Sequence, residues 1–115
     1  MQLITSNTLI LFALVSFVFI GPVSSQWIEI GTELRRSIGS AIAIARYFQI
    51  EGNIRVIEAY EWIPTGPDRN YYWVIFSVQS TTGARFSCHG GVLWDFRPAS
   101  GLVRIPYYPR CVPAY

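Results

Sequence analysis

The side chains of this 115-residue chain that best suit nucleophilic, redox or metal chemistry are two cysteines, Cys88 and Cys111, and a single histidine, His89. Cys88 and His89 are neighbours in a segment that alternates like a β-strand, so their side chains point to opposite faces of a sheet. They therefore do not form a nucleophile–base pair, and no second metal ligand is placed by spacing. We expect His89 to lie on the surface, and we expect no enzymatic activity, no metal and no cofactor.

The two cysteines suit a disulfide, because an even number of cysteines in a secreted chain is typical of paired ones. Cys88 and Cys111 are equidistant from the midpoint between Ala99 and Ser100. An antiparallel hairpin centred there places the cysteines directly opposite each other, within the distance that a disulfide spans. The same register predicts three further pairs on the cysteine face: Phe96 with Val103, Trp94 with Ile105, and Val92 with Tyr107.

The start of the chain resembles a secretory signal peptide. An apolar run from Leu9 to Ile20 ends at Gly21 and Pro22, and small residues follow before Gln26. A membrane anchor is the alternative, but crossing a bilayer takes about 20 apolar residues and this run is shorter. We expect residues 1–25 to be a signal peptide, residues 26–115 to form one small domain, and the protein to be secreted.

The charge of the chain bears on its partners. The formal net charge is +2, and the 9 basic residues are all arginines spread along the sequence. Without a localised basic patch, neither nucleic acid nor an anionic membrane surface is the expected partner. We expect a monomer that binds another protein and that has no contact with the membrane once the signal peptide is removed.

The segment from Thr32 to Asn53 carries apolar residues at steps of three and four, the spacing of an amphipathic helix. The predicted buried stripe consists of Leu34, Ile38, Ala41, Ala45 and Phe48. Thr32 is the expected N-cap, and Gly52 is expected to end the helix in a left-handed conformation. Gly39 costs about 1 kcal/mol relative to alanine inside a helix, so we expect it at a close contact with the sheet.

Strand-like patterns occupy most of the chain after this helix. Segments rich in β-branched and aromatic residues are separated by turn residues, and Gly90 and Gly91 allow a bulge or a bend. The expected strands are 54–63, 71–79, 84–96 and 102–108, with a short additional strand at 26–30. The sequence therefore predicts an α+β fold in which one N-terminal helix is wrapped by a four- to five-stranded antiparallel sheet.

A sequence signature joins the end of the predicted helix to the strand after it. Ile44–Asn53 reads IARYFQIEGN, and Arg55–Gly66 reads RVIEAYEWIPTG. These stretches resemble LARFAVxEHN and RVVKAKEQVVAG of the plant-type cystatins, in a divergent form. Val92–Pro98, VLWDFRP, is similar to VWVKP in a later strand of that family, and Trp27–Ile30 is similar to its short first strand. The resemblance extends over residues 26–115 and implies a cystatin-like fold.

The resemblance also implies inhibition of papain-like cysteine proteases. In cystatins a glycine-bearing N-terminus, a first hairpin loop QVVAG and a second hairpin carrying Pro-Trp form a wedge that fills the protease cleft. The corresponding protease-contact residues of this chain are Trp62, Ile63, Pro64, Thr65, Gly66, Pro98 and Ala99.

All three wedge segments depart from the family pattern, so the inhibition that we expect is weak and reversible. No glycine lies between the expected cleavage site and the first strand, and the first loop keeps only an aliphatic residue and the final Gly66. Ala99 stands where the family has tryptophan, and truncating such an anchor often costs about 2 kcal/mol or more. The alternative is a cystatin-fold binding protein that has lost inhibition.

The aromatic residues after the helix are more numerous than one small core needs. We expect some of them to form an exposed patch that binds a protein or a sugar. The residues concerned are Tyr60, Trp62, Tyr71, Tyr72, Trp73, Tyr107 and Tyr108.

Overall fold

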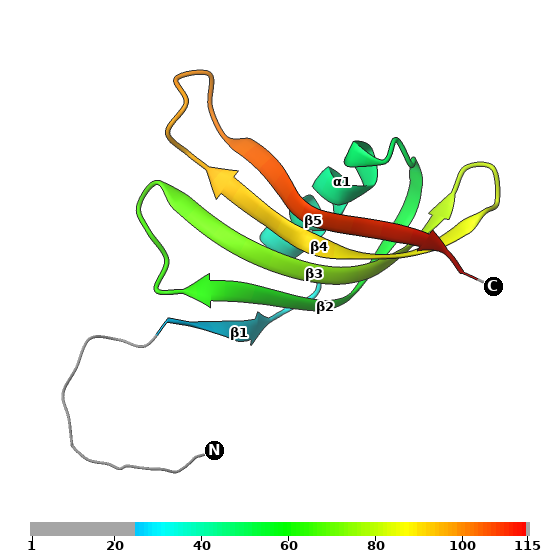
Figure 1. Ribbon diagram of the computed structural model, residues 1–115, viewed down its shortest axis with the longest axis horizontal. Coiled ribbons are helices and arrows are strands. Elements are labelled where there is room, and N and C mark those ends of the chain that lie inside the picture. The colour runs from blue at the N-terminus through cyan, green and yellow to red at the C-terminus, as the bar shows by residue number, and fades with distance from the viewer. Residues whose placement is uncertain (1–24, 115) are drawn as a thin grey trace, which may run out of the picture.

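The computed structural model describes residues 25–114, in which one helix packs on one face of an antiparallel sheet (Figure 1). The elements in chain order are β1 (Gln26–Ile30), α1 (Arg35–Tyr47), β2 (Gly52–Ile63), β3 (Arg69–Ser80), β4 (Arg85–Asp95) and β5 (Val103–Pro113). The five strands lie side by side in the order of the chain, so each strand pairs with its neighbours in sequence. The predicted α+β class and the antiparallel sheet are confirmed.

The predicted signal peptide, residues 1–25, lies outside the described residues except for its last position. Within residues 25–114, no helix is long and apolar enough to cross a membrane. Secretion stays a prediction.

The helix packs against the sheet through an unusually small stripe. Its buried residues are Ser37, Ser40, Ala41, Ile44 and Ala45. The predicted stripe was therefore right at Ala41 and Ala45 but wrong at Ile38 and Phe48, whose side chains are 40% and 36% exposed. The two serines belong to the buried face because their hydroxyls donate to backbone carbonyls, so burying them leaves no hydroxyl donor unpaired.

Both predicted ends of the helix were wrong. α1 begins after Leu34, which makes no side-chain cap, and Thr32 lies outside the helix. At the other end the left-handed residue is Gln49, with φ 59°, and the amide of Ile50 donates to the Ala45 carbonyl at 2.9 Å. Gly52 instead begins β2, where a Cβ atom would collide with the backbone of the neighbouring strand. Backbone hydrogen bonds therefore end this helix, and neither Thr32 nor Gly52 acts as a cap.

Gly39 lies at the close contact predicted for it. A Cβ atom there would stand 3.0 Å from Cζ2 of Trp94, whose indole N–H donates to the Ser40 hydroxyl at 2.9 Å. Around this contact the helix and the sheet enclose one core. Its buried members are Ala41, Ile44, Ala45, Ala59, Tyr72, Val74, Phe76, Val78, Cys88, Val92 and Trp94.

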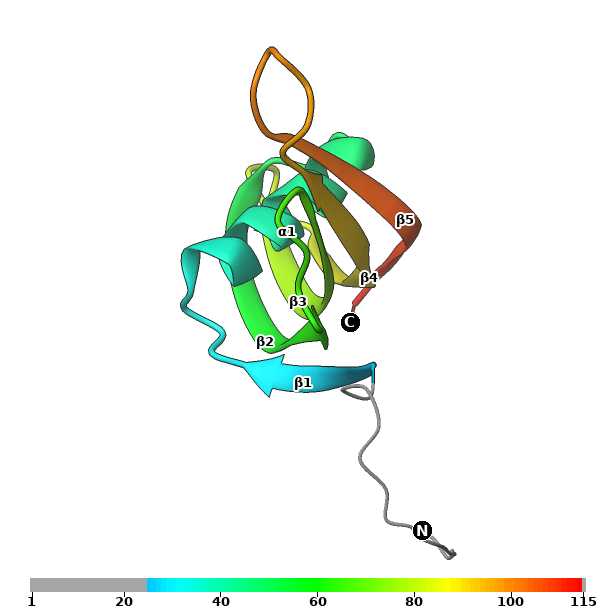
Figure 2. The same cartoon turned by 90° about the vertical axis from the view of Figure 1, so that its left-hand side faces the viewer.

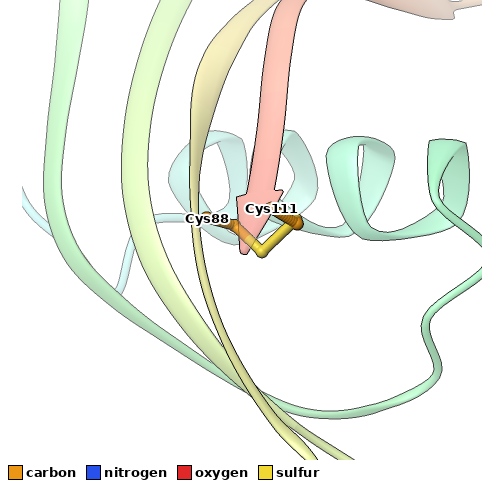
Figure 3. The surroundings of a disulfide bond; sticks show 2 residues. All are labelled: Cys88 and Cys111. Atoms are coloured by element: carbon orange, nitrogen blue, oxygen red, sulfur yellow. A yellow bond between two sulfur atoms is a disulfide. The ribbon is translucent and has the colours of Figure 1, made fainter. Parts of the chain in front are cut away.

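The predicted disulfide joins β4 to β5 (Figure 3). Cys88 and Cys111 are direct cross-strand partners with their Cα atoms 4.1 Å apart. The register inferred from them holds at the cysteines but fails towards the turn. There Leu93 pairs with Ile105 and Trp94 pairs with Arg104, so each partner on β5 is one residue off. The three predicted pairs, Phe96 with Val103, Trp94 with Ile105 and Val92 with Tyr107, were wrong.

A bulge in β5 causes this shift. Between the His89–Arg110 pair and the Gly91–Tyr107 pair, β5 has one residue more than β4. Tyr108 and Pro109 stand opposite the single residue Gly90. Tyr108 adopts a left-handed conformation with φ 51°, and Pro109 packs close to the buried Gly90. On the turn side of the bulge, each β5 side chain lies on the face opposite to the one that the predicted register gives it, because a one-residue shift reverses the alternation. The predicted glycine-associated bulge is thus present, but its extra residue lies in the partner strand.

Replacing Ala41 by leucine should lower the free energy of unfolding by about 1 to 3 kcal/mol, because Ala41 is fully buried where the helix is thinnest. Chemical denaturation measures the change. Ile38→Leu, at an exposed position of the same helix, is the control and should leave the stability nearly unaltered. An unchanged midpoint for Ala41→Leu would contradict this packing arrangement.

Replacing both cysteines by alanine should cost about 3 kcal/mol, since the disulfide closes a loop between residues 23 positions apart in sequence. Denaturation of the double variant beside the oxidised protein tests this value. Non-reducing peptide mapping supplies the direct check, and recovery of both thiols free from the native protein would rule out the bond.

Candidate functional site

The segments predicted to contact a protease lie at one end of the sheet. β1 starts there with Gln26 paired to Ile63, the last residue of β2. The loop 64–68 joins β2 to β3, and the turn 96–102 joins β4 to β5 at the same end (Figures 1 and 2). We call this end, with its two connecting segments, the loop end. The opposite end of the sheet carries the turn between β3 and β4.

The first connection exposes three of its predicted contact residues, Pro64, Thr65 and Gly66. Its base is held by the Gly66 amide, which donates to the Arg69 carbonyl at 3.3 Å. The other two predicted residues, Trp62 and Ile63, belong to β2 and are only partly exposed. Trp62 nevertheless lies beside the loop, because it lines a hollow of about 220 Å³ together with Pro64, Thr65 and Gly66.

The second connection is a turn that carries Pro98 and Ala99. Ala99 is exposed and Pro98 is partly exposed, while the Gly101 amide donates to the Pro98 carbonyl at 3.0 Å. The amide of Phe96 donates to the carbonyl of Asp68 at 2.9 Å. This bond links the two connections directly, so the loop end is one continuous edge.

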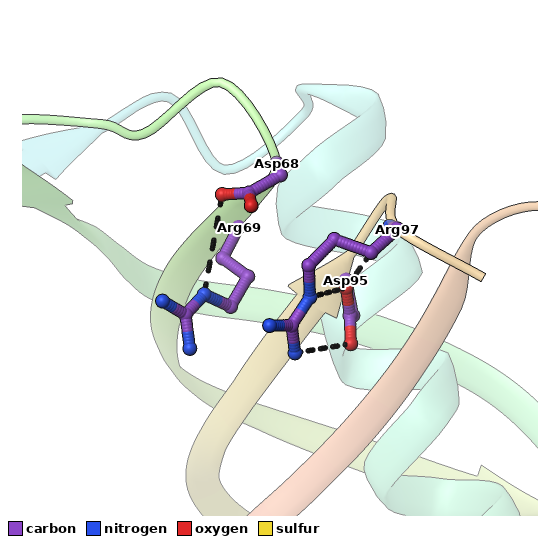
Figure 4. A network of polar contacts seen from close by, with 4 residues as sticks. All are labelled: Asp68, Arg69, Asp95 and Arg97. Atoms are coloured by element: carbon purple, nitrogen blue, oxygen red, sulfur yellow. Dashed lines mark hydrogen bonds and ion pairs between the residues drawn. The ribbon is translucent and has the colours of Figure 1, made fainter.

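An ion pair sets the start of the second connection. The Arg97 side chain donates to both carboxylate oxygens of Asp95, at 2.9 and 3.0 Å, and the Arg97 amide donates to the same carboxylate at 3.0 Å. Figure 4 shows this pair beside Asp68, the last residue of the first connection, and Arg69, the first residue of β3. The hydrogen bonds from Arg97 lower the pKa of Asp95 from 3.8 to about 2.

The second candidate site is the face of the sheet turned away from α1, which we call the outer face. β1, β2, β3 and β5 place aromatic side chains on it. The exposed fraction is 40% for Trp27, 36% for Tyr71 and 82% for Tyr108. The expected aromatic patch is therefore present, and contacts between its rings order it. Trp27 packs edge-on against Trp62 with ring centroids 5.1 Å apart, and Tyr71 does so against Tyr107 at 6.2 Å.

These aromatic residues line two hollows. The first, about 340 Å³, is bounded by Trp27, Trp62, Tyr71 and Tyr107, and we call it the aromatic groove. The second, about 320 Å³, is bounded by Trp27, Tyr60 and Trp73, and we call it the β1–β3 hollow. The sequence prediction omitted Trp27. The signal for it was the short strand at 26–30, whose alternation puts Trp27 on the same face as Trp62.

Tyr72 is the one predicted member of the patch that lies inside. It is 2% exposed and packs edge-on against Trp94, with ring centroids 5.4 Å apart. Burial, together with hydrogen bonding to Glu61, raises its pKa to about 12. Because side chains alternate along β3, Tyr72 faces the core while its neighbours Tyr71 and Trp73 face outward.

The single histidine lies on the outer face, as expected. His89 is exposed, and its ring is tilted against that of Trp73 with centroids 5.9 Å apart. Cys88, its neighbour, is held in the disulfide on the core side. Among residues 25–114, no group of three or more histidine, cysteine or acidic side chains is arranged to hold a metal ion.

No family model matches this chain, and no curated protein or solved structure is significantly similar to it.

The pH dependence of stability provides a test of the Asp95–Arg97 pair. A carboxyl group with a lowered pKa in the folded state stabilises the fold above its unfolded pKa near 4, and this contribution is lost as the pH falls towards 2. Asp95→Asn should therefore melt at a lower temperature than the unaltered protein at pH 7, and the gap should close between about pH 4 and pH 2.

Asp68→Asn is the matched control. The Asp68 carboxylate is half exposed, and its distance of 4.0 Å from the Arg69 guanidinium is long for an ion pair. The loss of melting temperature in Asp68→Asn at pH 7 should therefore be smaller than in Asp95→Asn. An Asp95→Asn gap that did not change with acidification would show that the ion pair contributes nothing.

Proposed function

We propose that this chain is a secreted, cystatin-like protein that binds papain-like cysteine proteases reversibly through the loop end of its sheet. The helix packed on five antiparallel strands is consistent with the fold that the sequence resemblance implies. The observation that carries the proposal is the hydrogen bond from the Phe96 amide to the Asp68 carbonyl. It joins the two connections with which a wedge-shaped inhibitor would enter a protease cleft.

The loop end has the chemistry that occlusion of a cleft requires. Its tips expose Pro64, Thr65, Gly66 and Ala99, which are small or weakly polar and can fill an apolar cleft. The Asp95–Arg97 pair fixes the approach of β4 to its turn, so less conformational entropy is lost on binding. No catalytic group is needed, because the inhibitor acts by blocking access.

The same geometry accounts for the weak inhibition that we propose. Ala99 supplies little of the area that an aromatic anchor would bury at the second tip. At the first tip, Pro64 restricts the backbone, and the ring of Trp62 is turned to the outer face against Trp27. Trp62 also lines the hollow at the first connection, but part of its ring is already in contact with Trp27, so it replaces only part of the missing anchor.

A non-inhibitory binding protein of the same fold is the second candidate. The observation that favours it is the aromatic groove, which holds the rings of Trp27, Trp62, Tyr71 and Tyr107 on a face that no element of residues 25–114 covers. Exposed clusters of this kind mark binding surfaces. In this case the loop end would be an ordinary pair of connections.

Titration of a papain-like protease with the purified, oxidised protein tests the first proposal. We expect weak inhibition, and Ala99→Trp should tighten it by roughly thirtyfold, the equivalent of about 2 kcal/mol at a restored anchor. Thr82→Trp adds the same side chain at the opposite end of the sheet and should have no effect. The control separates a specific contact from general stickiness.

Two results would change the proposal. Nanomolar inhibition by the unaltered protein, abolished by Trp62→Ala, would make Trp62 the anchor and the weak-inhibitor account wrong. If neither the unaltered chain nor Ala99→Trp inhibits, the non-inhibitory binding protein becomes the better account.

A further inference from the structure

The β1–β3 hollow is an aromatic-walled site distinct from the loop end. Its walls are Trp27 on β1, Tyr60 on β2 and Trp73 on β3, so three neighbouring strands each contribute one ring. Tyr60 and Trp73 are direct cross-strand partners on the outer face. The hollow, about 320 Å³, is open to solvent on one side, so its three rings can contact a compact group that rests in it.

Two carboxylates lie beside Tyr60, next to the hollow but not in its lining. Glu29 is the cross-strand partner of Tyr60, and Glu58 precedes it by two residues on the same face. The Tyr60 hydroxyl donates to the Glu58 carboxylate. That hydrogen bond, followed by partial burial and the charges of Glu58 and Glu29, raises the pKa of Tyr60.

No arginine lines the hollow. Four arginines have outer-face positions elsewhere. Arg69, paired with Asp95, lies at the loop end, and Arg110, paired with His89, lies at the β5 side of the sheet. Arg55, paired with Ser77, and Arg85, paired with Gln79, lie towards the opposite end of the strands. His89 touches Trp73 but lies on the strand beyond it, away from Tyr60 and Trp27. The hollow therefore combines π-faces with negative charge on the side where the carboxylates lie, which complements a cation.

The bonding of these groups selects among cations. One oxygen of Glu58 already accepts from Tyr60, so a guanidinium would have to break that bond to pair with the carboxylate in bidentate fashion. A primary ammonium has three N–H donors that pair with water or with the carboxylates, so it gains little from walls that offer no acceptor. A quaternary ammonium has no donors, and it needs only π-faces and nearby negative charge.

We propose that the β1–β3 hollow binds a quaternary ammonium group, with the rings of Trp27, Tyr60 and Trp73 as its walls and Glu29 and Glu58 as its charge complement. The hollow contains no residue of the two connections, so choline binding can be measured without a protease.

Choline and its neutral carbon isostere test this proposal with the purified, oxidised protein. The nitrogen–proton correlation NMR spectrum is followed during titration at constant ionic strength. Choline should shift the indole signals of Trp27 and Trp73 saturably, and should bind at least about fivefold more tightly than the isostere. The indole signal of Trp94 should stay in place, because its N–H is buried and donates to Ser40.

Variants assign the contacts. Trp73→Leu should weaken choline binding by about fivefold or more, whereas Tyr108→Leu, which removes an exposed ring outside the hollow, should not. Glu29→Gln and Glu58→Gln should weaken choline binding and leave the isostere unaffected. The unmoved Trp94 signal in each variant shows that the fold is intact.

Three outcomes would overturn the proposal. Equal affinity for choline and the isostere would mean that the hollow takes apolar groups without regard to charge. Tighter binding of methylguanidinium than of choline would assign the site to an arginine-like cation. Choline binding that survives Trp73→Leu undiminished would place it elsewhere on the protein.

Discussion

Trp94 is the contact through which the helix and the sheet fix each other's position. Its indole N–H donates to Ser40 on α1, and its ring lies so near Gly39 that a Cβ atom there would stand 3.0 Å away. On the sheet side the ring meets Tyr72, and the Arg104 guanidinium covers it at 4.6 Å from its centroid. A buried indole with its donor satisfied tolerates little displacement, because moving it would lose both packing and a hydrogen bond. The residue after it, Asp95, begins the ion pair that shapes the loop end, so the position of that end follows from the same anchor.

One short helix covers only one face of this sheet, and the outer face is left with its aromatic residues uncovered within residues 25–114. Exposed apolar faces and free strand edges both invite association. The edge of β5 is protected by Pro106, Pro109 and Pro113, which lack the amide donors that an added strand would need. Contacts by faces and by connecting loops are therefore favoured over strand addition along β5.

The sequence predicted the parts of this structure that depend on local patterns. The strand alternation, the opposed cysteines and the close approach at Gly39 could each be inferred from the type and the spacing of a few residues. The helix stripe was misplaced because Ser37 and Ser40 look polar in a sequence, while in the fold their hydroxyls are satisfied by backbone carbonyls. The gathering of the two connections at the loop end depends on the Phe96–Asp68 bond between distant segments, for which the sequence carries no local signal.

The error in the β4–β5 register has the largest structural consequence. Without the extra residue at Tyr108, Tyr107 would oppose Val92 and face the helix. With it, Tyr107 turns to the outer face and lies over Gly91, where a Cβ atom would collide with its ring. Burial there raises the pKa of Tyr107, and the ring closes the aromatic groove against Tyr71. The aromatic groove thus depends on the inserted residue of the β5 bulge and on the absence of a side chain at Gly91. The alternation of apolar residues in the sequence predicts neither the bulge nor the position of the Tyr107 ring.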